Sequence, residues 1–422
     1  MTGRRHTSSK STFRIAAVAL GAALVAGCGL VPGSAESAGD GTVTVMTWAP
    51  EKTDATNMPG MPAMAQAYAR WVNAHGGLGG RELKILTCND RNDSVGAAKC
   101  ARSAVDQDVV AVVGSYSQHG RAFLSPLESA GIPYIGGYGV SDAEFTSPLS
   151  YPVNGGQAAL LAGNGEQLAG ACDRTVLVRP DTIAGDELPS LLNSGLALRD
   201  RSAATDLRAA ENATDYGGQA LQALTTASAA PAGEGCVAAV LGDRTDTFFD
   251  SFRRLRADYP AVRTATVLGS VDQTVINRSG GAGSPYEGAY VTGWYPAADD
   301  ARWDPMRKAI NEQAFGDNRI DPADAGVQTT WIAYTVLKQL VEALGDREVS
   351  ARALRISLDQ GRKVTTGGLT PALRWGYDHM SAAGDFPRLV NARVTFQQVR
   401  QGRLVATRKG SVDVTDTLAK AS

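Results

Sequence analysis

Ser117 and His119 lie two residues apart in the segment GSYSQH (114–119), and a serine beside a histidine is the pair that nucleophilic catalysis uses. A hydrolase needs more than this pair, because a third group must orient the histidine in space. The serine of one large hydrolase class also stands in a Gly-x-Ser-x-Gly elbow, and no such elbow surrounds Ser117. A protein without enzymatic activity is therefore expected, with a Ser/His hydrolase as an alternative.

The chain offers few ligands for a metal or a phosphate. Between residues 28 and 422, histidine occurs at positions 75, 119 and 379, and no two cysteines have the Cys-x-x-Cys spacing of zinc sites. The glycine-rich GGLGG (76–80) follows a helical pattern rather than a strand, so it reads as a turn and not as a phosphate cradle. No cofactor or metal is expected.

The N-terminus has the pattern of an export signal. Residues 1–14 carry basic residues and no acidic residue, and residues 15–27 are apolar or small, a run too short to cross a bilayer comfortably. The run ends Val25-Ala26-Gly27-Cys28, which resembles the lipobox of bacterial lipoproteins. In that family the cysteine thiol receives a diacylglyceryl group and becomes the first residue after cleavage. We expect a lipoprotein signal peptide at 1–27, lipidation at Cys28 and anchoring to the cell membrane; an ordinary signal is the alternative.

The composition of residues 28–422 narrows the possible partners and the number of domains. Removing the four basic residues of 1–27 changes the formal net charge from −2 to −6, which argues against a nucleic-acid partner. Residues 28–41 are small, polar and glycine-rich, and they read as a flexible tether. The roughly 380 residues that follow exceed one typical domain and suggest two.

Strand and helix patterns alternate along the chain. Repeated alternation predicts parallel sheets with helices on both faces. The pattern occurs in two runs, so we expect an α/β protein with two doubly wound parallel-sheet lobes. The expected strands are 42–48, 82–88, 109–114, 132–137, 174–180, 203–209, 236–242 and 264–269, with a terminal hairpin in 390–408 turning at Gln401-Gly402.

Four cysteines follow Cys28, an even number that indicates two disulfides in an exported chain, with three alternative pairings. If the second lobe has strand order 2-1-3-4, Cys172 and Cys236 stand just before two neighbouring strands at one edge of the sheet. Cys88 ends a strand, and Cys100 lies one or two turns into the next helix. Cys88–Cys100 and Cys172–Cys236 are therefore the expected disulfides.

Two further segments carry a family resemblance. VNAHGGLGGRELKILTCNDRND (72–93) has an asparagine, a glycine-rich turn and an acidic strand end, and VDQDVVAVVGSYSQHGRAFLSPLESAGIPYIGG (105–137) follows it in the expected order. Together they resemble the type I periplasmic solute-binding proteins, in the branch that includes the leucine/isoleucine/valine-binding proteins. The resemblance implies a Venus-flytrap clamp, two lobes joined by three crossovers, with lobe 1 at 42–153 plus 289–365 and lobe 2 at 154–288 plus 366–410.

The same resemblance implies partners and location. Such proteins work outside the cytoplasm as monomers, and they deliver a small solute to the permease of an ATP-driven (ABC) transporter. A lipid anchor fits, because organisms without a closed periplasm must hold such a protein at the membrane. A lobe that senses its solute and signals to a membrane partner is the alternative function.

The binding site is expected where the carboxyl ends of the strands meet, since open α/β sheets bind ligands there. By the resemblance, residues 114–119 and 138–141 would supply donors to a ligand carboxylate. A turn-forming role for the serines, a core role for the aromatic rings and a solvated loop position for Asp272 remain open. The expected ligand-binding residues are Trp48, Ser115, Tyr116, Ser117, Gln118, Tyr138, Gly139, Ser141, Asp181, Asp272 and Trp294.

Three positions depart from the family pattern. Gln118 stands where a second serine is usual, Val140 where a threonine is usual, and Ala184 where lobe 2 usually has an aromatic residue. Losing a partner for a buried charged group costs about 1–3 kcal/mol. We therefore expect weak or absent binding of leucine, isoleucine and valine, and a preference for a neutral, amide-like or ring-containing solute.

Overall fold

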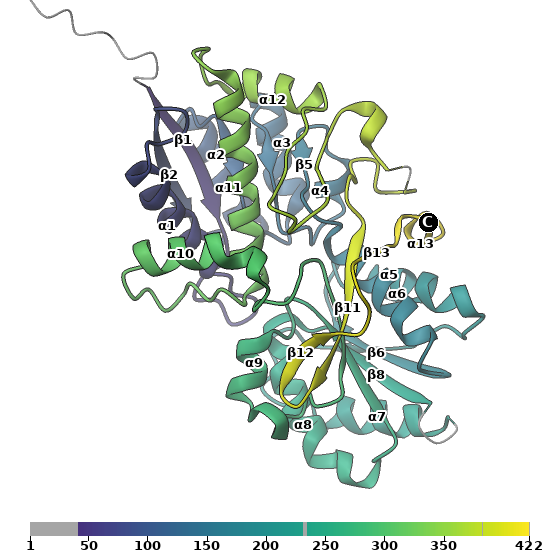
Figure 1. The fold of residues 1–422 in the computed structure, drawn as a ribbon. Helices are drawn as coiled ribbons and strands as arrows, with labels where there is room; N and C mark the ends of the chain where they lie inside the picture. Colours follow the sequence, from purple (N-terminus) through teal and green to yellow (C-terminus); the bar gives the residue numbers. More distant parts are fainter. Residues whose placement is uncertain (1–40, 231–233, 382, 422) are drawn as a thin grey trace, which may run out of the picture. The chain divides into compact units, whose positions relative to one another are not determined.

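The computed structural model describes residues 41–230, 234–381 and 383–421, and these belong to one compact unit that begins at Ala38. The expected signal peptide, Cys28 and all of the tether except Gly41 lie outside the described residues. The fold is α/β, with two sheets that each carry helices on both faces (Figure 1). The expected fold class is confirmed.

The first lobe is built on five parallel strands in the order β2-β1-β3-β4-β5. They are β1 (Thr42–Trp48), β2 (Glu82–Cys88), β3 (Ala111–Val113), β4 (Tyr134–Ile135) and β5 (Ser150–Tyr151). The helices are α1 (Gly60–Ala74), α2 (Ser94–Asp106), α3 (Gly120–Ala130), α4 (Ala143–Thr146), α10 (Asp304–Gln313), α11 (Ala325–Leu344) and α12 (Ala351–Asp359).

Side chains of β1 alternate between two cores. Val43 and Val45 pack in the cluster that contains α1 and α11, whereas Met46 and Trp48 pack in the cluster that contains α2 and α3. Burial on both faces is typical of parallel strands. This alternation decides where the last residue of β1 points.

The second lobe is built on an eight-stranded sheet in the order β12-β11-β10-β9-β8-β6-β7, with β13 paired to β11. The parallel strands are β6 (Arg174–Pro180), β7 (Thr205–Ala209), β8 (Gly235–Ala239), β9 (Arg263–Val267) and β10 (Tyr290–Gly293); β11 (Arg393–Arg400), β12 (Arg403–Ala406) and β13 (Val412–Asp413) pair antiparallel. The helices are α5 (Gly156–Ala169), α6 (Leu188–Leu196), α7 (Gly217–Ser228), α8 (Thr245–Leu255), α9 (Gln273–Arg278) and α13 (Thr415–Leu418).

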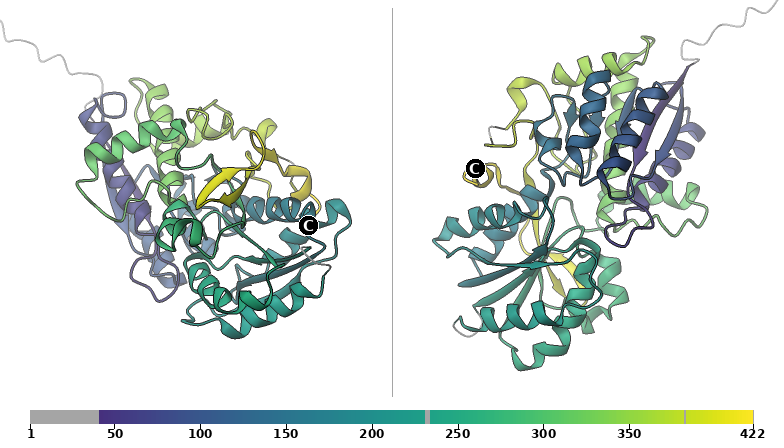
Figure 2. Two further views of the ribbon diagram at one scale, coloured as in Figure 1. Left: turned by 60° about the horizontal axis from the view of Figure 1, so that its bottom comes forward. Right: turned by 180° about the vertical axis from the view of Figure 1, so that it is seen from behind.

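Helices again cover both faces of this sheet. Leu177 and Ala238 share a core with α5 and α6, whereas Val176 and Val237 share one with α7 and α8. Figure 2 shows these two helix pairs on opposite sides of the strands. The strands β7-β6-β8-β9 have the expected order 2-1-3-4, and the hairpin turns at Gln401-Gly402 as expected.

Both expected disulfides are present. Cys88 and Cys100 are joined with Cα atoms 5.7 Å apart, and Cys172 and Cys236 with Cα atoms 5.9 Å apart. The second pairing follows from the register of neighbouring strands, in which Thr175 lies opposite Cys236.

Two expected lobe boundaries are wrong. Strand β10 pairs with β9 and β11 in the second sheet, although residues from 289 onward were expected in lobe 1. Residues 366–389 pack on lobe 1 instead of lobe 2, because the buried Trp375 donates its indole N–H to the Pro152 carbonyl and Arg388 N–H donates to the Phe145 carbonyl. The chain therefore crosses between the sheets near residues 152–156, 293–297 and 389–393.

No helix in the described part of the chain combines the length and apolar character that a bilayer crossing requires.

Candidate functional site

The carboxyl ends of the strands in the two sheets meet at a cleft between the lobes. Two adjoining cavities of about 60 Å³ each lie there, and both are lined by Thr56, Tyr116, Val140, Gln157 and Gly242. We call these two cavities the interlobe cleft. Its walls come from the loops after β1, β3 and β4 in lobe 1, from the start of α5, and from the loops after β6, β7, β8 and β9 in lobe 2. Further lining residues used below are Met58, Gln118, Tyr138, Glu211, Asp243 and Trp294.

Glu211, just beyond the end of β7, accepts hydrogen bonds from lobe 1. Gln118 Nε2 donates to Glu211 Oε1 at 2.9 Å, Thr56 Oγ1 donates at 3.1 Å and Asn92 Nδ2 at 3.3 Å. All three donors are neutral and all three bonds end at Oε1. Within the described residues, Glu211 Oε2 has no side-chain hydrogen bond. Glu211 thus links the lobes with one oxygen and keeps the other available for a further donor.

A second carboxylate of lobe 2, that of Asp243, also accepts a hydrogen bond from lobe 1. The backbone N–H of Asn57 donates to Asp243 Oδ2 at 3.1 Å. Beside it, the guanidinium of Arg244 donates to the carbonyl of Asp54. Bonds in which one partner is ionised are stronger than neutral ones, so these contacts stabilise the approach of the lobes.

Three aromatic rings form a continuous wall of the cleft. Tyr116 and Tyr138 meet edge to face with centroids 5.1 Å apart, and Tyr138 meets Trp294 in the same way at 5.1 Å. Trp294 is fixed because its indole N–H donates to the Gly156 carbonyl at 2.9 Å. Burial raises the pKa of both tyrosines well above the ordinary value, so the phenols stay neutral. The wall therefore offers apolar surface and ring faces that attract cations.

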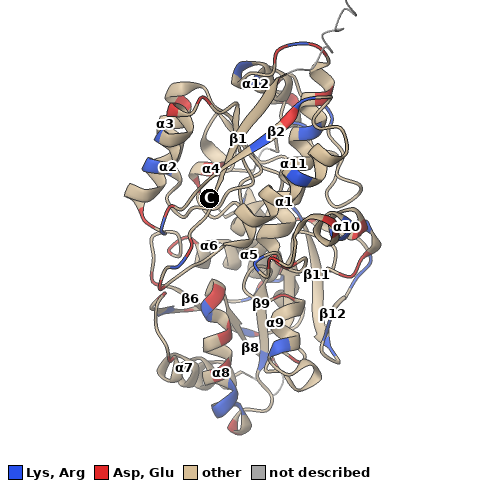
Figure 3. Cartoon of the chain, turned by 90° about the vertical axis from the view of Figure 1, so that its left-hand side faces the viewer, with Lys and Arg blue, Asp and Glu red and all other residues tan. Residues whose placement is uncertain are grey.

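The charge around the cleft is negative. Among the described residues that line it, Asp243 and Glu211 are acidic and none is lysine or arginine. Nearby, Asp324 caps α11 by accepting from Val327 N–H at 2.8 Å; burial, and more weakly the repulsion of Asp272, raise the pKa of its carboxyl to about 7. In the view of Figure 3, blue and red residues of the described chain are interspersed over both lobes.

The amides expected to hold a ligand carboxylate bind a carboxylate of the protein. Gly139 N–H donates to Glu144 Oε2 at 3.0 Å, and the N–H groups of Val140 and Ser141 donate to Oε1 at 3.1 and 3.2 Å. Ser141 Oγ adds a fourth bond to this carboxyl group, donating to Oε1 at 3.3 Å. Glu144 is 2% exposed; burial raises its pKa to about 7, although these hydrogen bonds act to lower it. Gly139 and Ser141 line a separate cavity of about 20 Å³ beside the interlobe cleft.

Four of the eleven expected ligand-binding residues line the interlobe cleft: Tyr116, Gln118, Tyr138 and Trp294. Trp48, also expected there, lies in the core instead, fully buried with its ring 5.3 Å from that of Phe123 and 6.0 Å from that of Tyr134. The alternation of β1 turns its side chain toward α2 and α3.

Ser115 and Ser117, also expected at the site, stabilise the backbone of the loop at residues 114–119 and the end of β1. Ser115 and Ser117 are fully buried; Ser115 Oγ accepts from Trp48 N–H at 3.0 Å, and Ser117 Oγ accepts from the backbone N–H of His119 at 3.2 Å. The ring of His119 makes no hydrogen bond to Ser117 in the described structure. This geometry provides neither an accessible nucleophile nor a base aligned with it. The described residues also contain no cluster of three or more acidic, histidine or cysteine side chains that could hold a metal.

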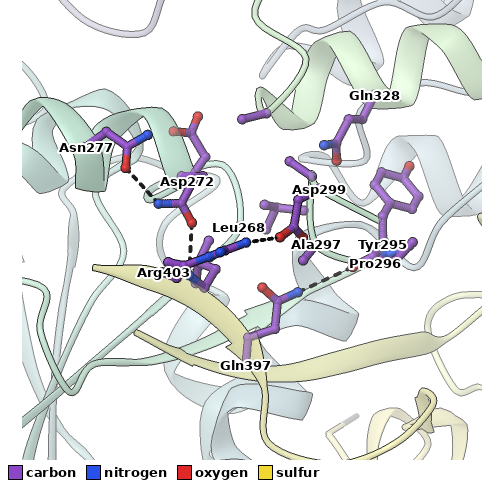
Figure 4. A pocket seen from close by; sticks show the side chains of 14 residues that line it. Leu268, Asp272, Asn277, Tyr295, Pro296, Ala297, Asp299, Gln328, Gln397 and Arg403 are labelled. Atoms are coloured by element: carbon purple, nitrogen blue, oxygen red, sulfur yellow. Dashed lines mark hydrogen bonds and ion pairs between the residues drawn. The ribbon is translucent and has the colours of Figure 1, made fainter. Parts of the chain in front are cut away.

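The two expected aspartates lie outside the interlobe cleft. Asp181 is exposed and stands 3.6 Å from Arg208. Asp272 caps α9 by accepting from Val275 N–H at 2.8 Å. It also lines a side cavity of about 310 Å³ whose other walls come from residues 295–299 and, in lobe 1, from Ala323 and Gln328. Figure 4 shows this side cavity, where Arg403 pairs with Asp299.

Sequence reasoning missed Glu211, Thr56 and Gln157. Glu211 follows the second strand of lobe 2, so the rule about carboxyl ends of strands, applied to β7 as to its neighbours, would have found it. Thr56 lies in the long loop after β1, and Gln157 begins the helix after the first crossover; neither segment carries a motif.

Comparisons with known proteins agree with this architecture. A family model described as "Periplasmic binding protein" matches residues 41–390. No curated protein matches the sequence.

Solved structures share the fold at low sequence identity. One described as a possible leucine/isoleucine/valine-binding protein from Rhodopirellula baltica SH 1 is 14% identical with a TM-score of 0.71, over 89% of this chain and 98% of the other. A solute-binding protein of an ABC transporter from R. palustris in complex with benzoate is 16% identical with a TM-score of 0.68, over 88% and 97%. A fatty acid ABC transporter substrate-binding protein from Thermomonospora curvata is 14% identical with a TM-score of 0.70, over 90% and 95%.

Proposed function

Because this chain belongs to the periplasmic binding protein family, we propose that it captures a small solute, an amino acid or a related amide-like compound, between its lobes for import by an ABC transporter. The observation that carries the proposal is the interlobe cleft, where Glu211 of lobe 2 accepts hydrogen bonds from three lobe 1 side chains beside a wall of aromatic rings. A site whose two halves belong to different lobes couples solute binding to lobe closure.

Family membership implies an extracytoplasmic location and a role as a binding protein rather than an enzyme. We further propose that the thiol of Cys28 carries a lipid that holds the protein to the outer face of the cell membrane, as a monomer that presents its solute to the permease. The sequence Val25-Ala26-Gly27-Cys28 supports this anchor. One acyl chain gives only reversible membrane binding, so more than one would be needed for a stable attachment.

The relatives of similar fold are described as solute-binding proteins for benzoate and for fatty acids, among others. Their identities of 14–16% to this chain carry no ligand over to it. The solute must be found by experiment.

The test is a thermal-shift screen of amino acids, amides and small heterocycles, followed by small-angle scattering with each ligand found. A solute that binds the folded state raises its stability by RT ln(1 + [L]/Kd), about 2.7 kcal/mol at 100 times Kd. The radius of gyration should fall when the ligand is present. Tyr138→Ala should weaken binding, whereas Tyr377→Ala, at a tyrosine that is 90% exposed, should leave it unchanged. A saturating ligand that produces no compaction, or no ligand at all, would contradict the proposal.

A further inference from the structure

The loop at residues 139–141 leaves none of its three backbone N–H groups for a ligand carboxylate. The three backbone N–H groups of Gly139, Val140 and Ser141 all donate to Glu144, at 3.0 to 3.2 Å. Glu144 is buried on α4 and lines neither cavity of the interlobe cleft. The protein's own carboxyl group therefore occupies three of the backbone donors that were expected to hold an acidic solute.

The remaining polar groups of the cleft favour a solute that carries a hydrogen-bond donor. Gln118 and Thr56 already donate to Glu211 Oε1, and Glu211 Oε2 is left without a side-chain partner in the described part of the chain. Asp243 adds a second negative charge, and no lysine or arginine lines the cleft among the described residues. An anion placed here would meet two like charges, and the guanidinium beside them, that of Arg244, already donates to the Asp54 carbonyl, so the cleft opposes anion binding.

The aromatic wall also favours a solute that donates hydrogen bonds and carries no negative charge. The rings of Tyr116, Tyr138 and Trp294 adjoin one another at 5.1 Å, and ring faces attract an ammonium group while they pack an apolar body. Gln157, whose side-chain amide makes no hydrogen bond within the described residues, supplies one neutral donor and acceptor in both cavities. Amide groups of this kind satisfy neutral polar atoms of a solute.

Resting on the proposed function, we infer that the solute of this cleft is an amine, or less strongly an amide, that has no carboxylate, with its N–H group held by Glu211 Oε2. Amino acids bind more weakly than the amines that correspond to them without the carboxyl group. The discrimination comes from two acidic side chains at the cleft and from a loop whose amides are already occupied.

The experiment compares matched probes by calorimetry on the soluble chain from residue 41. The aromatic set is benzylamine, benzamide, benzoate and phenylglycine; the aliphatic set is isobutylamine, isobutyramide, isobutyrate and valine. We expect the amine to bind most tightly in at least one set, the amide less tightly, and the amino acid and the carboxylate at least ten-fold more weakly than the amine.

Glu211→Gln tests the role of the Glu211 charge in solute binding while it keeps the hydrogen bonds that link the two lobes. It keeps one acceptor oxygen for Gln118 and Thr56 and puts an NH2 donor in the place of Oε2. An amine then loses both the charge and its acceptor, so its affinity should fall by about ten- to a hundred-fold. An amide can turn its carbonyl oxygen toward the new donor, so its affinity should change less. Asp181→Asn is the matched control, because it also removes one negative charge, from an exposed carboxylate in the loop after β6. It should leave the affinities for amine and amide unchanged.

Three outcomes overturn the inference: a carboxylate or amino acid that binds as tightly as its amine, equal losses of amine and amide affinity in Glu211→Gln, or no amine binding in either set. The first two leave the proposed solute capture intact, because a cleft ligand is then identified. Failure of the proposed function is recognised separately, when the wider screen yields no solute that compacts the protein.

Discussion

The phenol oxygen of Tyr138 in lobe 1 lies 2.0 Å from the position that a Cβ atom on Gly269 in lobe 2 would occupy. Gly269 follows β9 with a φ of +90°, a conformation that residues with a side chain rarely adopt. The close approach of the two lobes at this point therefore depends on a residue without a side chain.

Gly269→Ala should prevent the lobes from reaching this arrangement. The added methyl group must displace the Tyr138 hydroxyl, so ligand-induced compaction in small-angle scattering should be lost and affinity should fall. Tyr138→Phe in the same chain should restore closure, because the next atom of the ring is 3.3 Å from the added Cβ.

Gly288→Ala is the control for backbone strain. Gly288 has a similar φ of +82° and no atom within 4 Å of an added Cβ. Both alanine variants should lose about 1–2 kcal/mol of stability from the backbone conformation, and only Gly269→Ala should lose closure. Normal compaction in Gly269→Ala would show that this contact does not limit the motion.

Glu144 should make the chain less stable as the pH rises. Burial raises its pKa from 4.5 to about 7, so the folded state holds the proton more tightly than the unfolded state. Its contribution is fully favourable below pH 4.5 and is lost as the pH rises through about 7, a change of up to about 3 kcal/mol. Asp324 acts in the same direction.

Urea denaturation of the wild type and Glu144→Gln across this range measures the effect. The wild type should lose unfolding free energy between about pH 4.5 and 7, and the variant should lose less, because it removes one of the two carboxyls whose pKa is raised to about 7. Near-ultraviolet circular dichroism checks that the variant keeps its tertiary packing. An identical pH dependence in both proteins would assign the effect to other groups.

The two disulfides should contribute unequally. The Cys172–Cys236 bridge closes a loop of 64 residues and the Cys88–Cys100 bridge one of 12. Chain entropy of the unfolded state then predicts losses of about 4 and about 3 kcal/mol when each pair is replaced by alanine. Guanidinium unfolding of the two double variants gives the order, and a larger loss for Cys88→Ala/Cys100→Ala would refute the entropic account.

Cys28→Ala should release the protein from the membrane or leave an unprocessed precursor, because thioether formation requires the thiol. Membrane fractionation and intact mass of the purified protein measure both outcomes. Cys172→Ala/Cys236→Ala, which leaves residues 1–28 unchanged, should remain in the membrane fraction. A wild-type protein that begins with an unmodified residue would rule out the lipid anchor.

Sequence patterns predicted the strands well because each strand contributes its own apolar run. The bounds of β1, β2 and β6 agree with the expected ranges, and the order of β6 to β9 was sufficient to pair the cysteines correctly. The lobe boundary at residues 366–389 was wrong, because a segment without regular structure has no periodicity and is positioned by single contacts such as Trp375 with Pro152.

The site was harder to predict because proximity to a strand end does not fix the direction of a side chain. Trp48 ends β1 but points into the core, whereas Tyr138, after β4, reaches the cleft. The role of Glu144 could not be read from its neighbours in the sequence, since its buried position depends on how α4 packs against the loop at residues 139–141.

Two of the three crossovers leave the second sheet from strands that are already paired. Gly293 of β10 lies opposite Thr395 of β11, and Thr395 Oγ1 donates to the carbonyls of Gly293 at 3.1 Å and Tyr295 at 3.0 Å. The strands that enter these two crossovers are therefore joined as an antiparallel pair up to Gly293 and Thr395, and the Thr395 hydroxyl extends the link to Tyr295. A ribbon bends across its flat face far more readily than it shears along its length, since shear would break the pairing bonds. We expect this pairing to favour bending of the lobes over sliding, so that the loops after β4 and β9 meet in the same register at each closure.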